Sequence, residues 1–256
     1  MARLSSQPET GQRPEHFAKV SGSPGAAPRM TGLLRLLAPL FLLCFVAGYL
    51  ARAAWHWPPM QAPVIGAAFL FMAGVLAVMV TRGRERLESF LKGARGEEWV
   101  ARTLAFLPAT YRVYHGLRMP PSGMRKGTDY DHVVIGPTGL FLIETKNWSG
   151  RISIRDGMIL YNGEIPDRPP LEQVKTAAQA LRRELREVVH RGIEVQPVLC
   201  FAEGYLPDGQ TGAAGVLICT SHTLVDALLD PTDTPVSRGI LDQVAHHLEQ
   251  QLVAQG

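Results

Sequence analysis

The chain has 256 residues, of which 46% are apolar and 19% are charged, and its formal net charge at pH 7 is +3. This composition excludes a wholly disordered chain and a chain embedded throughout in a membrane, and the length allows one medium-sized domain with additional segments. The three cysteines, Cys44, Cys200 and Cys219, are far apart and show no CxxC spacing. They therefore argue against a disulfide framework or a zinc site.

Charge is distributed unevenly along the chain. Residues 82–160 contain 13 basic and 8 acidic side chains, a net charge of +5, whereas residues 161–256 contain 7 and 13, a net charge of −6. A basic half beside an acidic half permits a phosphate-binding face, although ordinary variation of surface charge explains the asymmetry equally well.

The N-terminal third has two different compositions. Residues 1–30 are rich in Pro, Gly, Ser and Gln and lack apolar periodicity, so we expect a disordered tail. Residues 36–51 and 63–80 are uncharged apolar runs, and the second would span roughly 27 Å of hydrocarbon as an α-helix. A short link with two tryptophans and a proline pair joins them, which predicts a two-helix transmembrane hairpin over residues 31–81.

Basic residues predict how this hairpin would be oriented. Arg29 and Arg35 precede the first run, and Arg82, Arg84 and Arg86 follow the second. By the positive-inside rule, both termini and the C-terminal domain would be cytoplasmic, as in a multi-pass protein of the cell inner membrane.

The sequence offers two alternatives to the hairpin. A signal peptide cleaved after residues 51–53 fits the small-residue rule, but the polar region before it is too long. A soluble protein with two buried helices conflicts with the absence of any polar face over residues 63–80.

The rest of the chain alternates helical and extended patterns. Residues 82–92 predict a juxtamembrane helix, and Gly93 and Gly96 indicate a break before a new helix whose first turn holds Glu97 and Glu98. Residues 139–146 are apolar on both faces and predict a central, buried strand. Further strands are expected over residues 111–117, 131–135, 150–154, 158–161, 195–201 and 215–220, and helices over residues 171–190, 224–229 and 240–252.

This order predicts an α/β fold, a mixed sheet flanked by helices. We expect the domain to occupy residues 93–205, with a strand and helices in residues 206–256 completing it.

The candidate chemistry lies on two consecutive strands. Asp131 opens one strand, and Glu144 and Lys146 end the next, two residues apart and therefore on the same side of the sheet. Asp131 would reach the same end only if its strand bends or bulges. Adjacent carboxylates repel each other unless a cation neutralises them, which Mg²⁺ (or Mn²⁺), an oxygen-preferring cation, would do.

Other side chains would complete such a site. Lys146 would position the attacking water and offset charge that develops on the phosphate. Glu97 would supply a third oxygen to the metal through water, or orient a water. Gln173, on the later helix, would reach the nucleophile or a phosphate.

Four separated blocks carry a family resemblance. They are Gly93-x-x-Gly96-Glu97, the run Thr128-Asp129-Tyr130-Asp131-His132, the run from Gly139 through Glu144-Thr145-Lys146-Asn147 to Gly150, and Pro170-x-x-Gln173. Together they resemble the NERD (nuclease-related) domain, which is similar to the PD-(D/E)xK nuclease superfamily. The similarity covers about residues 93–205, less than half of the chain.

The resemblance implies both a fold and a set of site residues. It implies a PD-(D/E)xK-like sheet and a site in which Asp131, Glu144 and Glu97 bind the metal and Lys146 and Gln173 complete the catalytic set. Homodimers are common in that superfamily.

The sequence therefore predicts a membrane-anchored, Mg²⁺-dependent nuclease that hydrolyses phosphodiester bonds in DNA. The alternative is a catalytically silent nuclease-fold module that binds nucleic acid or a protein partner as a membrane-tethered sensor or scaffold. Nothing in the sequence separates DNA from RNA as the substrate.

Overall fold

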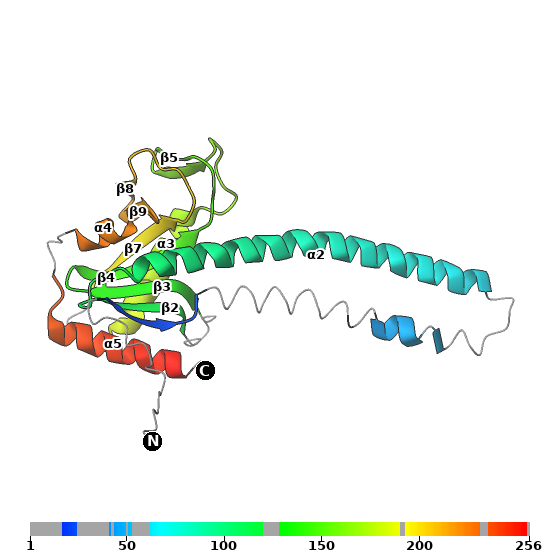
Figure 1. The fold of residues 1–256 in the computed structure, drawn as a ribbon, viewed down its shortest axis with the longest axis horizontal. Helices are drawn as coiled ribbons and strands as arrows, with labels where there is room; N and C mark the ends of the chain where they lie inside the picture. Colours follow the sequence, from blue (N-terminus) through cyan, green and yellow to red (C-terminus); the bar gives the residue numbers. More distant parts are fainter. Residues whose placement is uncertain are drawn as a thin grey trace, which may run out of the picture.

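The computed structural model describes residues 17–24, 41, 44–49, 51–52, 62–119, 128–189, 193–230 and 235–254. Within these residues the fold is built on a seven-stranded mixed sheet in the order β1-β2-β3-β4-β7-β9-β8, covered by helices on both faces (Figure 1). The strands are β1 (Lys19–Gly22), β2 (Arg112–Met119), β3 (Thr128–Gly136), β4 (Gly139–Lys146), β7 (Val195–Phe201), β8 (Gln210–Ala213) and β9 (Val216–Thr220). The predicted mixed α/β sheet flanked by helices is confirmed, and this architecture fits a nuclease-like fold.

Strand β4 is the centre of the sheet. It pairs antiparallel with β3 through a tight turn closed by Gly136 and Gly139, and it pairs parallel with β7 along its whole length. Its residues from Leu140 to Glu144 are buried, whereas Gly139, Thr145 and Lys146 are partly accessible. The predicted central strand over residues 139–146 is therefore confirmed, and its C-terminal end opens at the edge of the fold.

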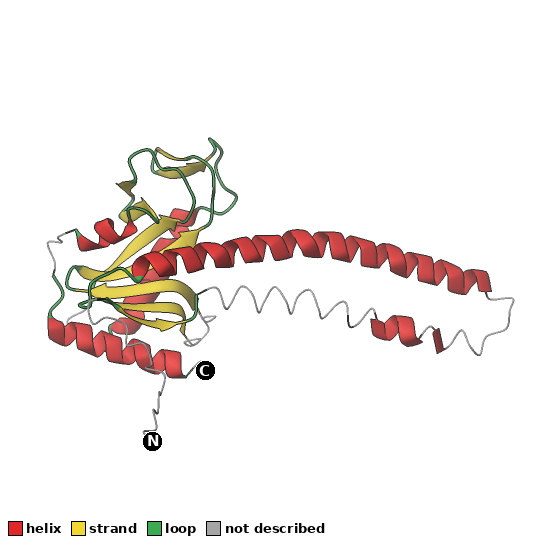
Figure 2. Cartoon of the chain, viewed as in Figure 1, coloured by secondary structure: helices red, strands yellow, loops and turns green. Residues whose placement is uncertain are grey.

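Two cores lie on opposite faces of the sheet. Helices α3 (Pro170–Leu185) and α5 (Arg238–Val253) cover one face, and α2 (Ala62–Leu104) and α4 (Leu224–Leu229) cover the other (Figure 2). Alternate residues of β4 go to the two cores, with Leu140 and Leu142 under α3 and Phe141 and Ile143 under α2. This alternation is why the strand reads as continuously apolar in the sequence.

Helix α2 differs from its prediction. Residues 82–92 are not a separate juxtamembrane helix, because α2 runs without interruption through Gly93 and Gly96. Glu97 and Glu98 accordingly lie in the last turns of this helix, not in the first turn of a new one. The predicted break is wrong because Gly96 serves a tertiary contact, described below, rather than a helix boundary.

The predicted transmembrane hairpin over residues 31–81, with its multi-pass inner-membrane localisation, is also wrong. No helix in the described part of the chain is both long and apolar enough to cross a bilayer. The apolar run at residues 63–80 belongs to α2, which continues directly into the charged residues that follow the run. Half of the run at residues 36–51, and residues 53–61 of the link after it, lie outside the described residues.

Part of the predicted disordered tail over residues 1–30 is ordered. Lys19–Gly22 form the edge strand β1, which pairs parallel with β2, and Ala18 is buried beside it with its N–H donating to the carbonyl of Leu107 at 2.8 Å. A four-residue strand is too short for alternation to be visible in the sequence. Residues 1–16 and 25–30 lie outside the described residues.

The remaining differences are small. The strands expected over residues 150–154 and 158–161 are present as β5 (Ile152–Arg155) and β6 (Met158–Tyr161), which pair with each other in a separate two-stranded sheet. Helix α3 ends at Leu185, earlier than the predicted residue 190. Strand β8 was not predicted, because its sequence, Gln-Thr-Gly-Ala, is small and polar.

A buried histidine pair connects β2 and β3. His115 and His132 are opposite each other in the ladder, and their Nδ1 atoms are 2.7 Å apart, so that one ring donates a hydrogen bond to the other. Burial lowers the pKa of His115 to about 4, and burial together with the nearby His115 lowers the pKa of His132 well below its usual value. Both rings are therefore neutral near pH 7.

This pair should make the protein less stable in mild acid. An unfolded histidine takes up a proton near pH 6.5, whereas His115 in the fold does so only near pH 4, so stability that is present above pH 6.5 is lost as the pH falls toward 4. For His115 alone, going from pH 7 to pH 5 should lower the free energy of unfolding by about 2 kcal/mol. Urea unfolding at the two pH values measures this.

The matched variants are His115→Gln and, at an exposed position, His222→Gln. The His115 variant should show a smaller loss between pH 7 and pH 5, and the His222 variant should behave like the wild type. The same loss in all three proteins would contradict this assignment.

Candidate active site

The C-terminal end of β4 brings together three of the predicted side chains. Lys146 Nζ donates to Glu144 Oε1 at 2.8 Å and to Gln173 Oε1 at 3.0 Å, and Gln173 Nε2 donates to the same Glu144 oxygen at 2.6 Å. Gln173 reaches this point from the first turn of α3, on the sheet face that Glu144 and Lys146 share. The spacing of two residues along β4 therefore places Glu144 and Lys146 on the same side of the sheet, as predicted.

Asp131 joins this group through the backbone of β4. The β3–β4 ladder ends at the pair His132–Ile143, and the next free N–H on β4, that of Thr145, donates to Asp131 Oδ2 at 2.8 Å. A side-chain carboxylate thus accepts a hydrogen bond at the position where the strand pairing stops.

The bend required by the sequence analysis is present in β3. Tyr130 and Val133 pack into the same core although they are three residues apart, and strict alternation would place them on opposite faces. On β2, Tyr114 and Leu117 show the same shift, with Gly116 between them at a φ of 60°. In both β2 and β3, therefore, the alternation of side chains between the two faces of the sheet shifts by one residue beside Asp131. Gly116 adopts the left-handed backbone conformation that this shift needs.

Burial and neighbouring acids make ionisation of the Asp131 carboxyl group unfavourable. Burial raises the pKa of Asp131 well above its usual range, and the charges of Glu144 and Glu97 raise it further. The Thr145 N–H bond and Lys146 act in the opposite direction. Excess negative charge is therefore concentrated at this end of the sheet.

Glu97 approaches from the opposite side of the sheet, on α2. The helix comes close because residue 96 is glycine: a Cβ there would lie 2.7 Å from Asn147 Cβ. Asn147 in turn donates from Nδ2 to the carbonyl oxygen of Lys92 at 2.6 Å. This contact fixes the end of α2 to the residue after Lys146, and it places Glu97 close enough to act on Asp131.

The donor set can be compared with what a divalent cation needs. Within the described residues, no group of three or more His, Cys, Asp or Glu side chains is arranged to hold a metal ion. Mg²⁺, however, is commonly bound by one or two carboxylates with water completing its coordination. The adjacent carboxylates of Asp131 and Glu144, whose charges repel each other, fit such a cation.

Sequence reasoning missed two residues of this region. Thr145 and Asn147 each lie beside Lys146 in the block that ends at Gly150, and this position is the signal that could have found them. Trp148, the next residue, packs against Tyr161 and Phe201, with ring centroids 4.9 and 5.4 Å away.

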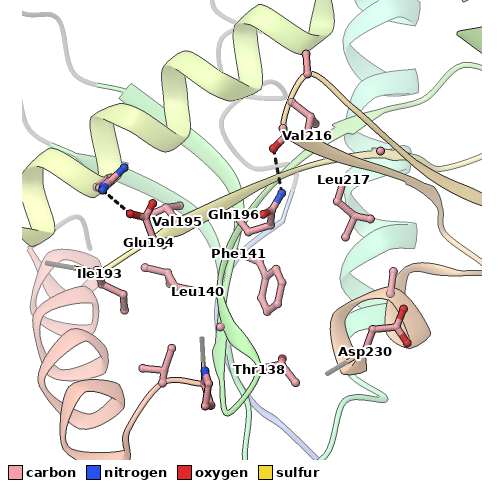
Figure 3. A pocket seen from close by; sticks show the side chains of 18 of the residues that line it. Thr138, Leu140, Phe141, Ile193, Glu194, Val195, Gln196, Val216, Leu217 and Asp230 are labelled. Carbon is pink, nitrogen blue, oxygen red and sulfur yellow. Dashed lines mark hydrogen bonds and ion pairs between the residues drawn. The ribbon is translucent and has the colours of Figure 1, made fainter. Parts of the chain in front are cut away.

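A cavity of about 1110 Å³ lies at the other end of β4. It is lined by the start of β4 and β7 and by the turn between β8 and β9, with the Arg182–Glu194 ion pair and a hydrogen bond from Gln196 to the Gly215 carbonyl at its walls (Figure 3). Leu140 and Lys146 are roughly 20 Å apart along the strand. The cavity is therefore separate from the carboxylate cluster.

The seven-stranded mixed sheet with helices on both faces fits a nuclease-like α/β fold. The family model of the nuclease-related domain (NERD) matches residues 92–202, which are less than half of the chain. An uncharacterized protein of Bacillus anthracis is 42% identical over 62 residues, which are 24% of this chain and 29% of that protein. The chain thus spans less than a third of that relative's length, and no solved structure matches the chain.

The raised pKa of Asp131 predicts that this carboxylate destabilises the fold near neutral pH. A group whose pKa is raised by folding favours the native state at low pH, and that contribution is lost as the pH rises through the folded-state pKa. Asp131→Asn keeps an oxygen for the Thr145 N–H and removes the charge. It should therefore raise the urea midpoint of unfolding at pH 7. Asp167→Asn, on the exposed surface, is the control; a lower midpoint for Asp131→Asn would contradict the repulsion.

The contact between α2 and β4 predicts opposite effects at two glycines. Gly96→Ala forces its Cβ against Asn147 and should lower the free energy of unfolding by about 1–3 kcal/mol. Gly93→Ala has open space around it and should raise the free energy by up to about 1 kcal/mol, because alanine favours helix. Chemical denaturation of both variants tests this. An equal change of the same sign at both positions would show that the close approach at Gly96 is unimportant.

Proposed function

We propose that the domain is a metal-dependent nuclease that hydrolyses phosphodiester bonds in DNA. The observation that carries this proposal is the convergence of Asp131, Glu144, Lys146 and Gln173 at the C-terminal end of β4. It is supported by the match of the surrounding residues to a nuclease-related domain.

The carboxylates would hold the cation. Asp131 and Glu144 would bind Mg²⁺ or Mn²⁺, and Glu97 would contribute a third oxygen through water. Such an ion, when bound, neutralises the phosphate and lowers the pKa of a water molecule. The relief of repulsion at Asp131 would favour its binding, since both carboxylates can then be ionised together.

Lys146 would act on the water and the phosphate, and Gln173 would position Lys146 and Glu144. The Lys146 side chain is 21% exposed, so that it can reach solvent from its place beside Glu144. It would orient the attacking water and offset the negative charge that develops on the phosphate oxygens. One P–O bond forms to the water oxygen and one P–O ester bond breaks, and the leaving oxygen takes up a proton. Gln173 holds both Glu144 and Lys146, and thereby fixes their relative orientation.

A specific observation favours the alternative of a non-catalytic module. Lys146 and Gln173 both donate to Glu144 Oε1, and the described residues contain no preassembled group of three ligating side chains. A domain fixed in this state would bind nucleic acid or a protein partner without cleaving it. Calorimetric titration of Mn²⁺ discriminates: binding that is lost in Asp131→Ala favours the nuclease, and the absence of binding favours the module.

Cleavage assays test the nuclease directly. The full chain would be incubated with plasmid, single-stranded and branched DNA, and with RNA, in Mn²⁺ or in EDTA. Asp131→Ala and Lys146→Ala should each lower metal-dependent cleavage by roughly 100-fold or more. Asp167→Ala and Lys175→Ala, an exposed acid and a partly exposed lysine, are the matched controls and should cleave like the wild type. Equal cleavage by all five proteins would remove the case for this site.

A further inference from the structure

The last turns of α2 present a face that the proposed chemistry does not use. Lys92, Arg95, Trp99 and Arg102 follow one another at intervals of three, four and three residues, so they lie on one side of the helix. All four are exposed, whereas Ala94, Val100, Ala101 and Leu104 on the other side are buried against the sheet. We call these four residues the basic face of α2.

The composition of this face is unusual for a solvated helix surface. Trp99 leaves 48% of its surface exposed, although a large apolar core lies directly beneath the same helix. Within the described residues, none of the three cations forms a salt bridge, while cations such as Lys19, Arg112 and Lys175 each pair with an acid. Glu88, one turn before Lys92, shares the face, but no ion pair joins the two.

The basic face begins at the border of the carboxylate cluster. The carbonyl of Lys92 accepts the hydrogen bond from Asn147, the residue after Lys146, and Gly96 on the same turn touches Asn147. From Lys92 to Arg102 the helix rises about 15 Å, comparable to about four nucleotides of backbone at ~3.4 Å each. In Figure 1 this end of α2 lies across the sheet, with its outer side away from the strands.

We propose that the basic face of α2 binds single-stranded nucleic acid and leads it to the carboxylate cluster. Lys92, Arg95 and Arg102 contact phosphates, and Trp99 stacks on an unpaired base. Phosphates supply the negative charge that these cations lack in the fold, and an exposed aromatic ring between cations suits stacking on a base of any sequence. This assignment of the substrate rests on the proposed nuclease function. The same helix then serves both tasks, with Glu97 on its inner side and the substrate path on its outer side.

Binding in EDTA tests the proposal without cleavage. Fluorescence anisotropy of a labelled 20-nucleotide DNA strand would be measured with the full chain over a range of salt concentrations. The triple variant Lys92→Ala/Arg95→Ala/Arg102→Ala should weaken binding at least tenfold. It should also reduce the slope of log K against log salt by about 2, since each phosphate contact on a single strand contributes about 0.7.

Two further variants test whether the loss of affinity comes from this face rather than from a change in net charge or in packing. Arg183→Ala/Arg186→Ala/Arg238→Ala removes the same charge at exposed positions elsewhere and should leave the affinity within about twofold. Trp99→Ala should weaken single-strand binding by about tenfold and duplex binding much less, because stacking needs an unpaired base. Equal weakening by the two triple variants, or no binding by the wild type, would overturn the proposal.

A cleavage arm distinguishes this inference from the proposed function. If the wild type binds through the basic face in EDTA but never cleaves in Mn²⁺, the hydrolytic function fails while the binding surface stands. If the wild type cleaves in an Asp131-dependent manner and the basic-face variant binds and cleaves single strands as well as the wild type, the function stands and this inference fails.

Discussion

The hydrogen bond from the Thr145 N–H to the Asp131 carboxylate is the constraint on which the site depends. It occupies the point where the β3–β4 ladder stops, so a charged side chain accepts a bond in the sheet instead of a backbone carbonyl. Its partner atom is fixed by β4, the central strand of the sheet. Asp131 is therefore held in place by a backbone N–H of β4, although its own strand, β3, bends at this level.

This placement concentrates charge that the fold alone does not balance. Asp131 is influenced by two other carboxylates, Glu144 and Glu97, while Lys146 is the cation that acts on it. A domain selected only for stability would gain by losing one of these acids, because buried like charges are costly. Retaining them at one point is reasonable if a cation or a phosphate-bound metal is the missing partner, which is a functional argument rather than a structural one.

Local pattern was sufficient for four elements. Strands β4, β6 and β7 and helix α4 have the predicted bounds, because mainly apolar runs between turn residues leave few alternatives. Long-range contacts decided the rest. At Gly96 local pattern favours a helix break, because the contact with Asn147 is distant in sequence. Strands β1 and β8 are defined by their neighbours in the sheet rather than by their own residues. Within the site, the E-x-K spacing predicted that Glu144 and Lys146 share a face. The position of Asp131 depended on Gly116, a residue of another strand that no motif includes.

Helix α2 links these observations. Its inner side needs a glycine, because only a residue without Cβ lets the helix approach Asn147 closely enough to set Glu97 against Asp131. Its outer side has no such packing requirement, so the cations and the tryptophan there are not explained by the core. Over three turns a helix moves as one body, so that residues at its two ends shift together. A shift that separates Gly96 from Asn147 would thus move Glu97 and the basic face together, and it would alter the carboxylate cluster and the approach to it in one step.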